Sequence, residues 1–330
     1  MLVEEMGSGT MEKPSINLSF IVIGIIGLVL SACSPVPTSE VDQIPLEMPL
    51  VANDGFPRID GSTSTAPLGA KIICAMMEVP CSWVEFIDGN RYLMPDLSNY
   101  QADFPGFGHQ GTHSAYLNLI DGSTDLILVA RSPSNEELEL AELSGVSFDI
   151  RPIALDAFVF MVNEDNPIPG LTVDEIQGIY SGEITNWQQV GGPSVQINPY
   201  QRNDQSGSQQ LMRSLVMKDL PMIDAPELIL LKMIAPFYAI SEDPHGIGYS
   251  VFYYEENMAP NEYIKLVAVD GVQPTQESIT NRTYPFTTEV FSVVRAGSPP
   301  NSLAVRLRDW LLTTDGQELV AQSGYAPYPD

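Results

Sequence analysis

The sequence predicts an α/β fold whose chain is divided into two lobes. Short apolar runs alternate with helical patterns over residues 57–143, an order typical of parallel sheets flanked by helices. Two apolar runs, 150–162 and 284–295, are too long for single ordinary buried strands and suit two crossings between lobes. The length of 330 residues is enough for two folded units. The predicted division is 57–155 plus 284–330 for lobe 1 and 156–283 for lobe 2.

The first predicted unit is a strand, a hydroxyl-rich turn and a helix. The turn Gly61–Pro67 follows Ile59-Asp60, and Pro67 suits a first helical turn capped by Ser64 or Thr65. Apolar residues then recur at helical spacing up to Met77. A second short strand is predicted at 83–86.

Further elements alternate in the same way. A helix is expected over 114–121, a buried parallel strand over 125–130, and a helix over 136–143 capped by Asn135. Thr172 and Glu175 form a capping box that opens a helix ending at Tyr180. The remaining elements expected are a strand tip at 246–249 and helices at 303–312 and 317–322.

The N-terminus indicates export. Residues 17–32 form an uncharged apolar run, shorter than the roughly 20 residues of a membrane span, that ends in small residues before Cys33. This ending resembles a bacterial lipobox, so we expect residues 1–32 to be a signal peptide and Cys33 to carry a lipid; the alternative is an uncleaved anchor helix. Translation starts at either Met1 or Met11. Residues 33–56, rich in proline and acids, are expected to be an extended tether.

The charge limits the partners. A formal net charge of −27 argues against binding nucleic acid or anionic membrane surfaces. It also argues against long-range attraction of an anion, so an anion site here must act through local hydrogen bonds. With Cys33 assigned to a lipid, Cys74 and Cys81 either form a disulfide or stay as two buried thiols.

Three turns of similar composition suggest an oxyanion site. Gly61–Ser64, Gly111–His113 and Ser206–Ser208 each contain glycine and hydroxyl groups, and each precedes a helix. Unsatisfied N–H groups at helix starts bind anions, and Arg202 adds a planar set of donors. Each turn alone also suits a plain helix cap. Together, at the ends of parallel strands, they favour an anion held between two lobes.

Catalytic and nucleotide motifs are missing from the sequence. Neither GxxxxGK[ST] nor GxGxxG occurs, and His109 and His113 lack the glutamate of a zinc-binding HExxH helix. Ser206 lies outside a nucleophile-elbow context. We therefore expect no enzyme activity, no metal and no cofactor.

Two of the turns resemble the signature loops of periplasmic-type phosphate-binding proteins of ABC transporters. Gly61–Pro67 is similar to the first loop of that family, and Arg202–Ser208 to the second. Further segments agree in order, including Leu171–Trp187 and Gly246–Tyr249, so the similarity covers nearly everything after Ile59. The resemblance implies a two-lobed type II periplasmic binding protein fold with two hinge crossings.

The same resemblance implies a set of phosphate ligands. In the first lobe these are Thr63, the Ser64 amide and Thr112, with Ser62 as a further candidate. Asp204 is implied to orient the arginine of the second lobe. The ligands implied there are Arg202, Ser206, Gly207 and Ser208.

One departure from the family pattern concerns selectivity. Phosphate binders of the enteric type carry Ser-Asp-Ala where this chain has Arg131 and Ser132 before Pro133. Their aspartate accepts the proton of hydrogenphosphate, so fully ionised sulfate leaves two acceptors facing each other. Here Arg131 is either a second cationic ligand or turned outward to Glu136 and Glu137, and Ser132 beside it is a further possible ligand.

The function implied is an extracytoplasmic solute-binding lipoprotein that captures inorganic phosphate for an ABC permease and acts as a monomer. One alternative is a binding protein for another oxyanion or a small organic acid. The other is a sensory or surface lipoprotein with the same fold but no role in transport.

Overall fold

A mixed sheet forms the centre of the computed structural model, which describes residues 56–98, 108–218 and 220–329. Its strand order is β1-β4-β13-β5-β10-β7, and β11 and β14 pair with β5 as well. The pairs β1–β4 and β7–β10 are parallel, whereas β5 is antiparallel to each of its partners. The strands of this sheet are β1 (Ile59–Gly61), β4 (Leu126–Val129), β5 (Phe148–Asn163), β7 (Asn198–Pro199), β10 (Gly246–Val251), β11 (Ile264–Leu266), β13 (Thr287–Arg295) and β14 (Ala326–Pro327).

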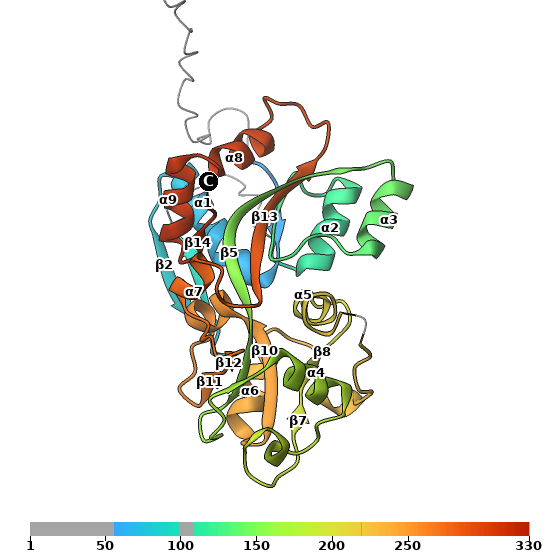
Figure 1. Ribbon diagram of the computed structural model, residues 1–330. Helices are drawn as coiled ribbons and strands as arrows, with labels where there is room; N and C mark the ends of the chain where they lie inside the picture. The colour runs from blue at the N-terminus through green and yellow to red at the C-terminus, as the bar shows by residue number, and fades with distance from the viewer. Residues whose placement is uncertain (1–55, 99–107, 219, 330) are drawn as a thin grey trace, which may run out of the picture. The chain divides into compact units, whose positions relative to one another are not determined.

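The long strand β5 joins two halves of this sheet (Figure 1). Residues Phe148–Ala157 pair with β13, and Phe158–Val162 pair with β10. Every residue of β5 from Ile153 onward is buried, as expected for a strand covered on both faces. We call β1, β4, β13 and the start of β5 the first half, and β7, β10, β11 and the end of β5 the second half.

The expectation of parallel strands is correct only in part. The pair β1–β4 is parallel, but β13 is antiparallel to both β4 and β5. The chain passes along β5 into the second half and returns along β13, so these two crossings must run in opposite directions. Two long neighbouring strands therefore produce a mixed sheet.

Helices cover both faces of the first half: α1, α8 and α9 lie on one side of β5 and β13, and α2 and α3 lie on the other (Figure 1). The α-helices are α1 (Ala66–Met77), α2 (Thr112–Asp121), α3 (Asn135–Leu143), α4 (Val173–Ser181), α5 (Gly207–Leu211), α6 (Ala235–Glu242), α7 (Gln276–Thr280), α8 (Leu303–Leu311) and α9 (Thr314–Gln322). Single 3₁₀ turns occur at Thr63–Thr65, Trp187–Val190 and Pro226–Leu228, and π-helical turns at Met212–Met217 and Tyr254–Met258.

Two predicted helix starts have different outcomes. The capping box of Thr172 with Glu175 is confirmed at the start of α4. The cap of α3 is Ser134, not Asn135, because the Ser134 hydroxyl accepts the N–H of Glu137 and the Glu137 carboxylate accepts the N–H of Ser134. Asn135 is the first helical residue.

The predicted strand at 83–86 exists but does not join the main sheet. It is part of β2 (Cys81–Glu85), which pairs with β3 (Arg91–Pro95) as a separate antiparallel hairpin. A disulfide between Cys74 and Cys81, with Cα atoms 5.9 Å apart, ties this hairpin to the end of α1. The open choice between disulfide and thiols is thereby resolved as a disulfide.

Two further pairs of two-residue strands lie outside the main sheet. The relevant ranges are β6 (Gly170–Leu171) with β12 (Ala268–Val269), and β8 (Gln201–Arg202) with β9 (Ile229–Leu230). The predicted signal peptide, Cys33 and the tether up to residue 55 lie outside the described residues. Among the residues that are described, none of the helices has the length and apolar character needed to cross a bilayer.

Candidate functional site

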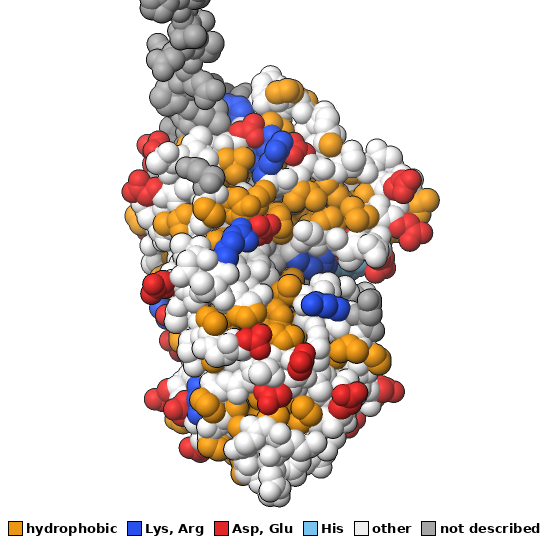
Figure 2. Space-filling view, in the orientation of Figure 1, with side chains coloured by type: hydrophobic (Ala, Val, Ile, Leu, Met, Phe, Trp, Pro, Cys, Tyr) orange, Lys and Arg blue, Asp and Glu red, His pale blue; other side chains and the backbone are white. Residues whose placement is uncertain are grey.

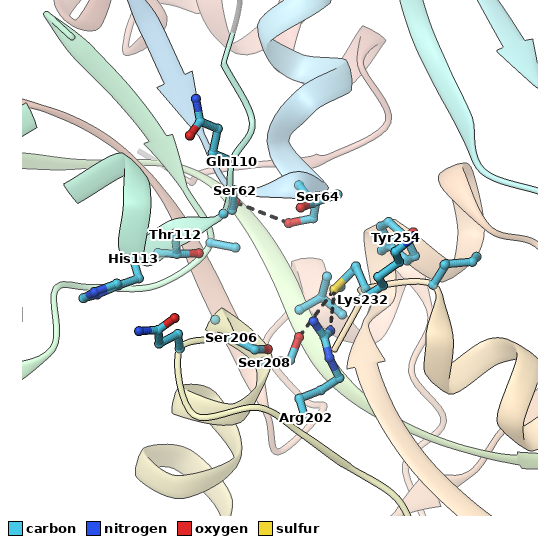
Figure 3. Close-up of a pocket in the computed structure, with 18 of the residues that line it drawn as sticks. Ser62, Ser64, Gln110, Thr112, His113, Arg202, Ser206, Ser208, Lys232 and Tyr254 are labelled. Atoms are coloured by element: carbon cyan, nitrogen blue, oxygen red, sulfur yellow. Dashed lines mark hydrogen bonds between the residues drawn. The ribbon is translucent and has the colours of Figure 1, made fainter. Parts of the chain in front are cut away.

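A cavity of about 410 Å³ brings together the three hydroxyl-rich turns (Figure 3). The first half of the sheet contributes the turn after β1, the start of α2 and the end of β4. The second half contributes the segment from β8 to α5 and the loop before α6. Of the predicted ligands it is lined by Ser62, Thr63, Ser64, Thr112, Arg131, Arg202, Ser206, Gly207 and Ser208.

The turn after β1 is held tightly against β4. A Cβ at Gly61 would lie 2.3 Å from the Leu128 carbonyl oxygen, so only glycine fits there. The Thr65 hydroxyl donates to the same carbonyl at 2.7 Å. Ser62 and Ser64 are 6% and 3% exposed, with their hydroxyl oxygens 3.5 Å apart. These contacts hold two buried hydroxyls at the cavity wall.

The two halves also approach each other where α2 and α5 begin. A Cβ placed on Gly207 would lie 2.7 Å from the Thr112 hydroxyl oxygen. Gly111, with φ of 105°, precedes Thr112 as the N-cap of α2. The start of α5 is capped by Ser206, whose hydroxyl accepts the N–H of Gln209. Glycine at 207 thus permits a contact between the two walls that a side chain would block.

Arg202 is a buried cation without an acidic partner. Its side chain is 6% exposed, and its Nε and Nη2 donate to the carbonyls of Leu230 (3.0 Å) and Leu231 (3.2 Å). Its Nη1 lies 3.3 Å from the Met233 sulfur. Within the described residues no carboxylate forms a salt bridge with it. Burial lowers the pKa of Arg202 to about 10, which leaves the guanidinium protonated at neutral pH.

Arg131 is also buried but its charge is neutralised. Its two terminal nitrogens donate to both carboxylate oxygens of Glu137 at 2.7 and 2.8 Å, and Glu137 is fully buried. The His113 ring nitrogen lies 3.0 Å from the same carboxylate. Burial acts to raise the pKa of Glu137, but the hydrogen bonds and charge of Arg131 outweigh it and lower that pKa. Of the two predicted alternatives, the structure shows pairing with Glu137, in the interior rather than outward.

Two residues of the predicted site lie elsewhere. The Asp204 side chain is 75% exposed and forms an ion pair with Arg213 at 2.6 Å. The expectation that it orients Arg202 is therefore wrong, because the turn directs it to the outer surface. Ser132 lines a neighbouring cavity of about 570 Å³ instead of this one.

The cavity also has walls that sequence reasoning did not find. Asp88, Asn90 and Tyr92 reach it from the β2–β3 hairpin, and Lys232 and Tyr254 from the second half. The hairpin residues fall in a stretch without periodicity, so no signal in the sequence pointed to them.

The donors that line the cavity suit the binding of an anion. The part of the chain that the structure describes contains no group of three His, Cys, Asp or Glu side chains placed to hold a metal ion. The cavity wall contains hydroxyl groups, the starts of α2 and α5, Asp88, Lys232 and the Arg202 guanidinium, which has no acidic partner among the described residues. Such donors bind an oxyanion in a site shielded from water.

Comparisons with known proteins agree with this architecture. A phosphate-binding protein PstS of Borreliella burgdorferi is 24% identical over 279 residues, which is 83% of this chain and 90% of that protein. Protein SphX of Synechococcus elongatus is 25% identical over 238 residues, 67% of this chain and 68% of its own length. 

Solved structures with the same fold include two proteins of low sequence identity. An ABC-type phosphate transport receptor from Vibrio cholerae aligns with a TM-score of 0.59 at 20% identity, over 83% of this chain and all of that one. A Clostridium perfringens protein crystallised with bound phosphate aligns with a TM-score of 0.62 at 22% identity, over 82% and 99%. They match the α/β fold of the type II periplasmic binding proteins. The model of the PBP superfamily domain matches residues 92–315, so this chain belongs to the PBP superfamily.

Proposed function

We propose that this chain binds inorganic phosphate in the cavity between the two halves of its sheet and supplies it to an ABC permease. The observation that carries the proposal is Arg202, a buried guanidinium that has carbonyl partners but, within the described part of the chain, no acidic one. A buried charge without a counter-ion is costly, and a bound anion would remove that cost. The proposed ligands around it are Thr63, Ser64, Thr112, Ser206, Gly207 and Ser208, with Ser62 as a further candidate.

The names of similar proteins favour phosphate over other anions as the ligand. The PstS and SphX sequences cover most of this chain, and PstS is named for phosphate binding. The neutral donors of the cavity also suit a chain whose net charge is −27. Figure 2 shows acidic side chains spread over the face in view, and basic side chains both on that surface and in the hollow between the two halves, so binding would depend on local hydrogen bonds.

Binding would be coupled to closure of two lobes, residues 57–155 plus 284–330 and residues 156–283. The crossings near Asp156 and Tyr284 would act as hinges, since Asp156 lies on β5 opposite the start of β13 and Tyr284 lies three residues before β13. An anion that contacts both lobes shifts the equilibrium toward the closed state by its differential affinity. No bond is made or broken in this cycle, so the protein acts as a receptor and not as an enzyme.

The proposed setting is extracytoplasmic. Residues 1–32 would be removed as a signal peptide, the lipid on Cys33 would anchor the protein, and residues 33–56 would space the domain from the membrane. The protein would act as a monomer beside its permease. The disulfide between Cys74 and Cys81 fits an oxidising compartment.

The test is anion-induced stabilisation of two arginine variants. We expect millimolar phosphate to raise the Tm of the wild-type chain, because a ligand that binds only the folded state stabilises it. Arg202→Ala should abolish this rise, with a loss of affinity of at least about 100-fold, since charge-assisted bonds to a buried site are lost. The matched control is Arg213→Ala, which removes the same charge from an exposed side chain. Unchanged stabilisation in Arg202→Ala would disprove the site.

A further inference from the structure

Met233 contacts two of the groups proposed to bind phosphate. Its sulfur lies 3.3 Å from Nη1 of Arg202 and 3.6 Å from the hydroxyl oxygen of Ser208 (Figure 3). The residue lies in the turn between β9 and α6, is partly buried and lines the cavity. A thioether is therefore bonded to donors that the proposed anion would use.

The segment that carries Met233 also supplies the other partners of the Arg202 side chain. Nε and Nη2 of Arg202 donate to the carbonyls of Leu230 and Leu231. The parallel pairing of β8 with β9 places Arg202 opposite Leu230, so the guanidinium and this segment are held in register. One short stretch of chain thus provides an acceptor for each of the three guanidinium nitrogens.

The sulfur is the weakest of these three acceptors. A carbonyl oxygen accepts hydrogen bonds strongly, whereas a thioether sulfur accepts them only weakly. The Ser208 hydroxyl has one hydrogen, so it must leave Met233 in order to donate to an anion. Replacing the sulfur by a phosphate oxygen exchanges two weak bonds for charge-assisted ones. Met233 would thus hold both donors until an anion displaces it.

Oxidation would turn this weak acceptor into a strong one. Hydrogen peroxide transfers one oxygen atom to a thioether: an S–O bond forms, the O–O bond breaks, and the sulfur is oxidised by two electrons. The other peroxide oxygen is reduced and leaves as water with both protons. The resulting sulfoxide is polar, and its oxygen carries a partial negative charge that accepts hydrogen bonds from a cation. An anion would then have to displace a strong acceptor from the same donors.

We propose that Met233 is a modification site at which peroxides inhibit anion binding, because its sulfoxide occupies the donors of Arg202 and Ser208. Met233 lines the cavity, so an oxidant as small as hydrogen peroxide has access to its sulfur. The exposed Lys232 beside it stays charged in both forms, so a loss of affinity reports the new acceptor and not a change in charge. The inference deepens the proposed function and rests on it.

Calorimetric titration with inorganic phosphate before and after treatment with hydrogen peroxide tests the proposal. Wild-type protein should lose at least about tenfold in affinity, in proportion to the fraction of Met233 sulfoxide measured by mass spectrometry. Met233→Leu keeps the volume but removes the acceptor, so it should bind phosphate about threefold more tightly than wild type and lose no affinity on treatment. The matched control is Met222→Leu, since Met222 is also partly buried but its sulfur contacts Gln209. This variant should respond to peroxide as wild type does.

The outcomes separate this inference from the proposed function. Untreated wild-type protein that binds no phosphate overturns both. If it binds phosphate but Met233 resists oxidation, or its oxidation leaves the affinity unchanged, the role of Met233 is refuted while the binding function stands. An equal loss in treated Met233→Leu also refutes that role, as does weaker binding by the untreated variant, because the sulfur would then assist the anion.

A second measurement on the wild-type chain covers the case in which Met233→Leu does not fold. Methionine sulfoxide reductases for both epimers convert the sulfoxide of the oxidised protein back to the thioether. Mass spectrometry follows the return of Met233 to the thioether, and the phosphate affinity should recover in step with it. An affinity that stays low once Met233 is reduced would refute the proposal.

Discussion

Two arginines line the same cavity, and their surroundings differ. Arg202 and Arg131 are each 6% exposed. Arg131 is held by both oxygens of Glu137, whereas Arg202 is held by two backbone carbonyls and a methionine sulfur. Carbonyls orient a guanidinium but do not cancel its charge. The difference shows that the partner, not the residue type, decides which arginine is available to an anion.

Two buried carboxylates show the same contrast from the acidic side. Glu137 is fully buried, yet its pKa is lowered because Arg131 outweighs the effect of burial. Asp156, on β5, accepts the N–H groups of Ala157 and Tyr253 through one oxygen, while its other oxygen has no partner among the described residues. Burial raises the pKa of Asp156 to about 7. A buried acid is thus ionised or neutral according to its partner.

Breaking the Arg131–Glu137 pair should have the largest effect on folding. Arg131→Met leaves Glu137 buried and unpaired, which we expect to lower the free energy of unfolding by roughly 3–5 kcal/mol. The double variant Arg131→Met with Glu137→Gln should recover most of this loss, because no uncompensated charge remains. Urea unfolding of the single and double variants measures the coupling.

The control for that cycle is Arg213→Met, an exposed arginine that should change the free energy of unfolding by no more than about 0.5 kcal/mol. Additive losses in the double variant would contradict the view that Arg131 is neutralised by Glu137. They would also remove the contrast with Arg202.

Asp156 should make the free energy of unfolding depend on pH with a sign opposite to that of Glu137. As pH rises above about 4, Asp156 ionises in the unfolded chain but stays protonated in the folded one until about pH 7. The wild-type chain should therefore lose up to about 4 kcal/mol relative to Asp156→Asn between these values, and no more above pH 7. Glu137, whose pKa is lowered, contributes stability that is lost only as pH falls below about 4.

Urea unfolding of both proteins from pH 4.5 to pH 8 isolates Asp156, because the many other carboxylates are common to the two chains. A difference between wild type and Asp156→Asn that stays constant over this range would show that Asp156 is ionised throughout in the folded state. In that case the lack of a cationic partner would not give Asp156 a higher pKa than Glu137.

The fold was predictable from the sequence because its signals are local. Helix caps such as Thr172 with Glu175 act within one turn, and the long apolar runs around Asp156 and Tyr284 mark the two crossings directly. The mixed sheet was not foreseen as such, since strand direction depends on how β5 and β13 pair. The type II fold itself is confirmed by the comparisons.

Residues that line the cavity could be predicted only where a single segment of the sequence contains both the motif and the residues around it. The turns at Gly61 and Ser206 do so, and the residues named there stay predictions until binding is measured. Asp88 could not be found, because the hydrogen bonds of its turn join residues 150 and 164 positions apart in the chain. The prediction that Asp204 orients Arg202 failed because nearness in sequence does not determine on which side of the turn a side chain lies.

The smallest predicted effect is that of removing the helix cap at Ser134, which lies beside the Arg131–Glu137 ion pair. The Ser134 hydroxyl accepts the N–H of Glu137 at 3.3 Å, so Ser134→Ala should cost only about 1 kcal/mol of unfolding free energy. The matched control is Thr172→Ala, which removes the equivalent bond from the capping box of α4 and should cost about the same. Urea unfolding compares the two. If Ser134→Ala costs as much as Arg131→Met, the cost of Arg131→Met cannot be assigned to an unpaired charge on Glu137.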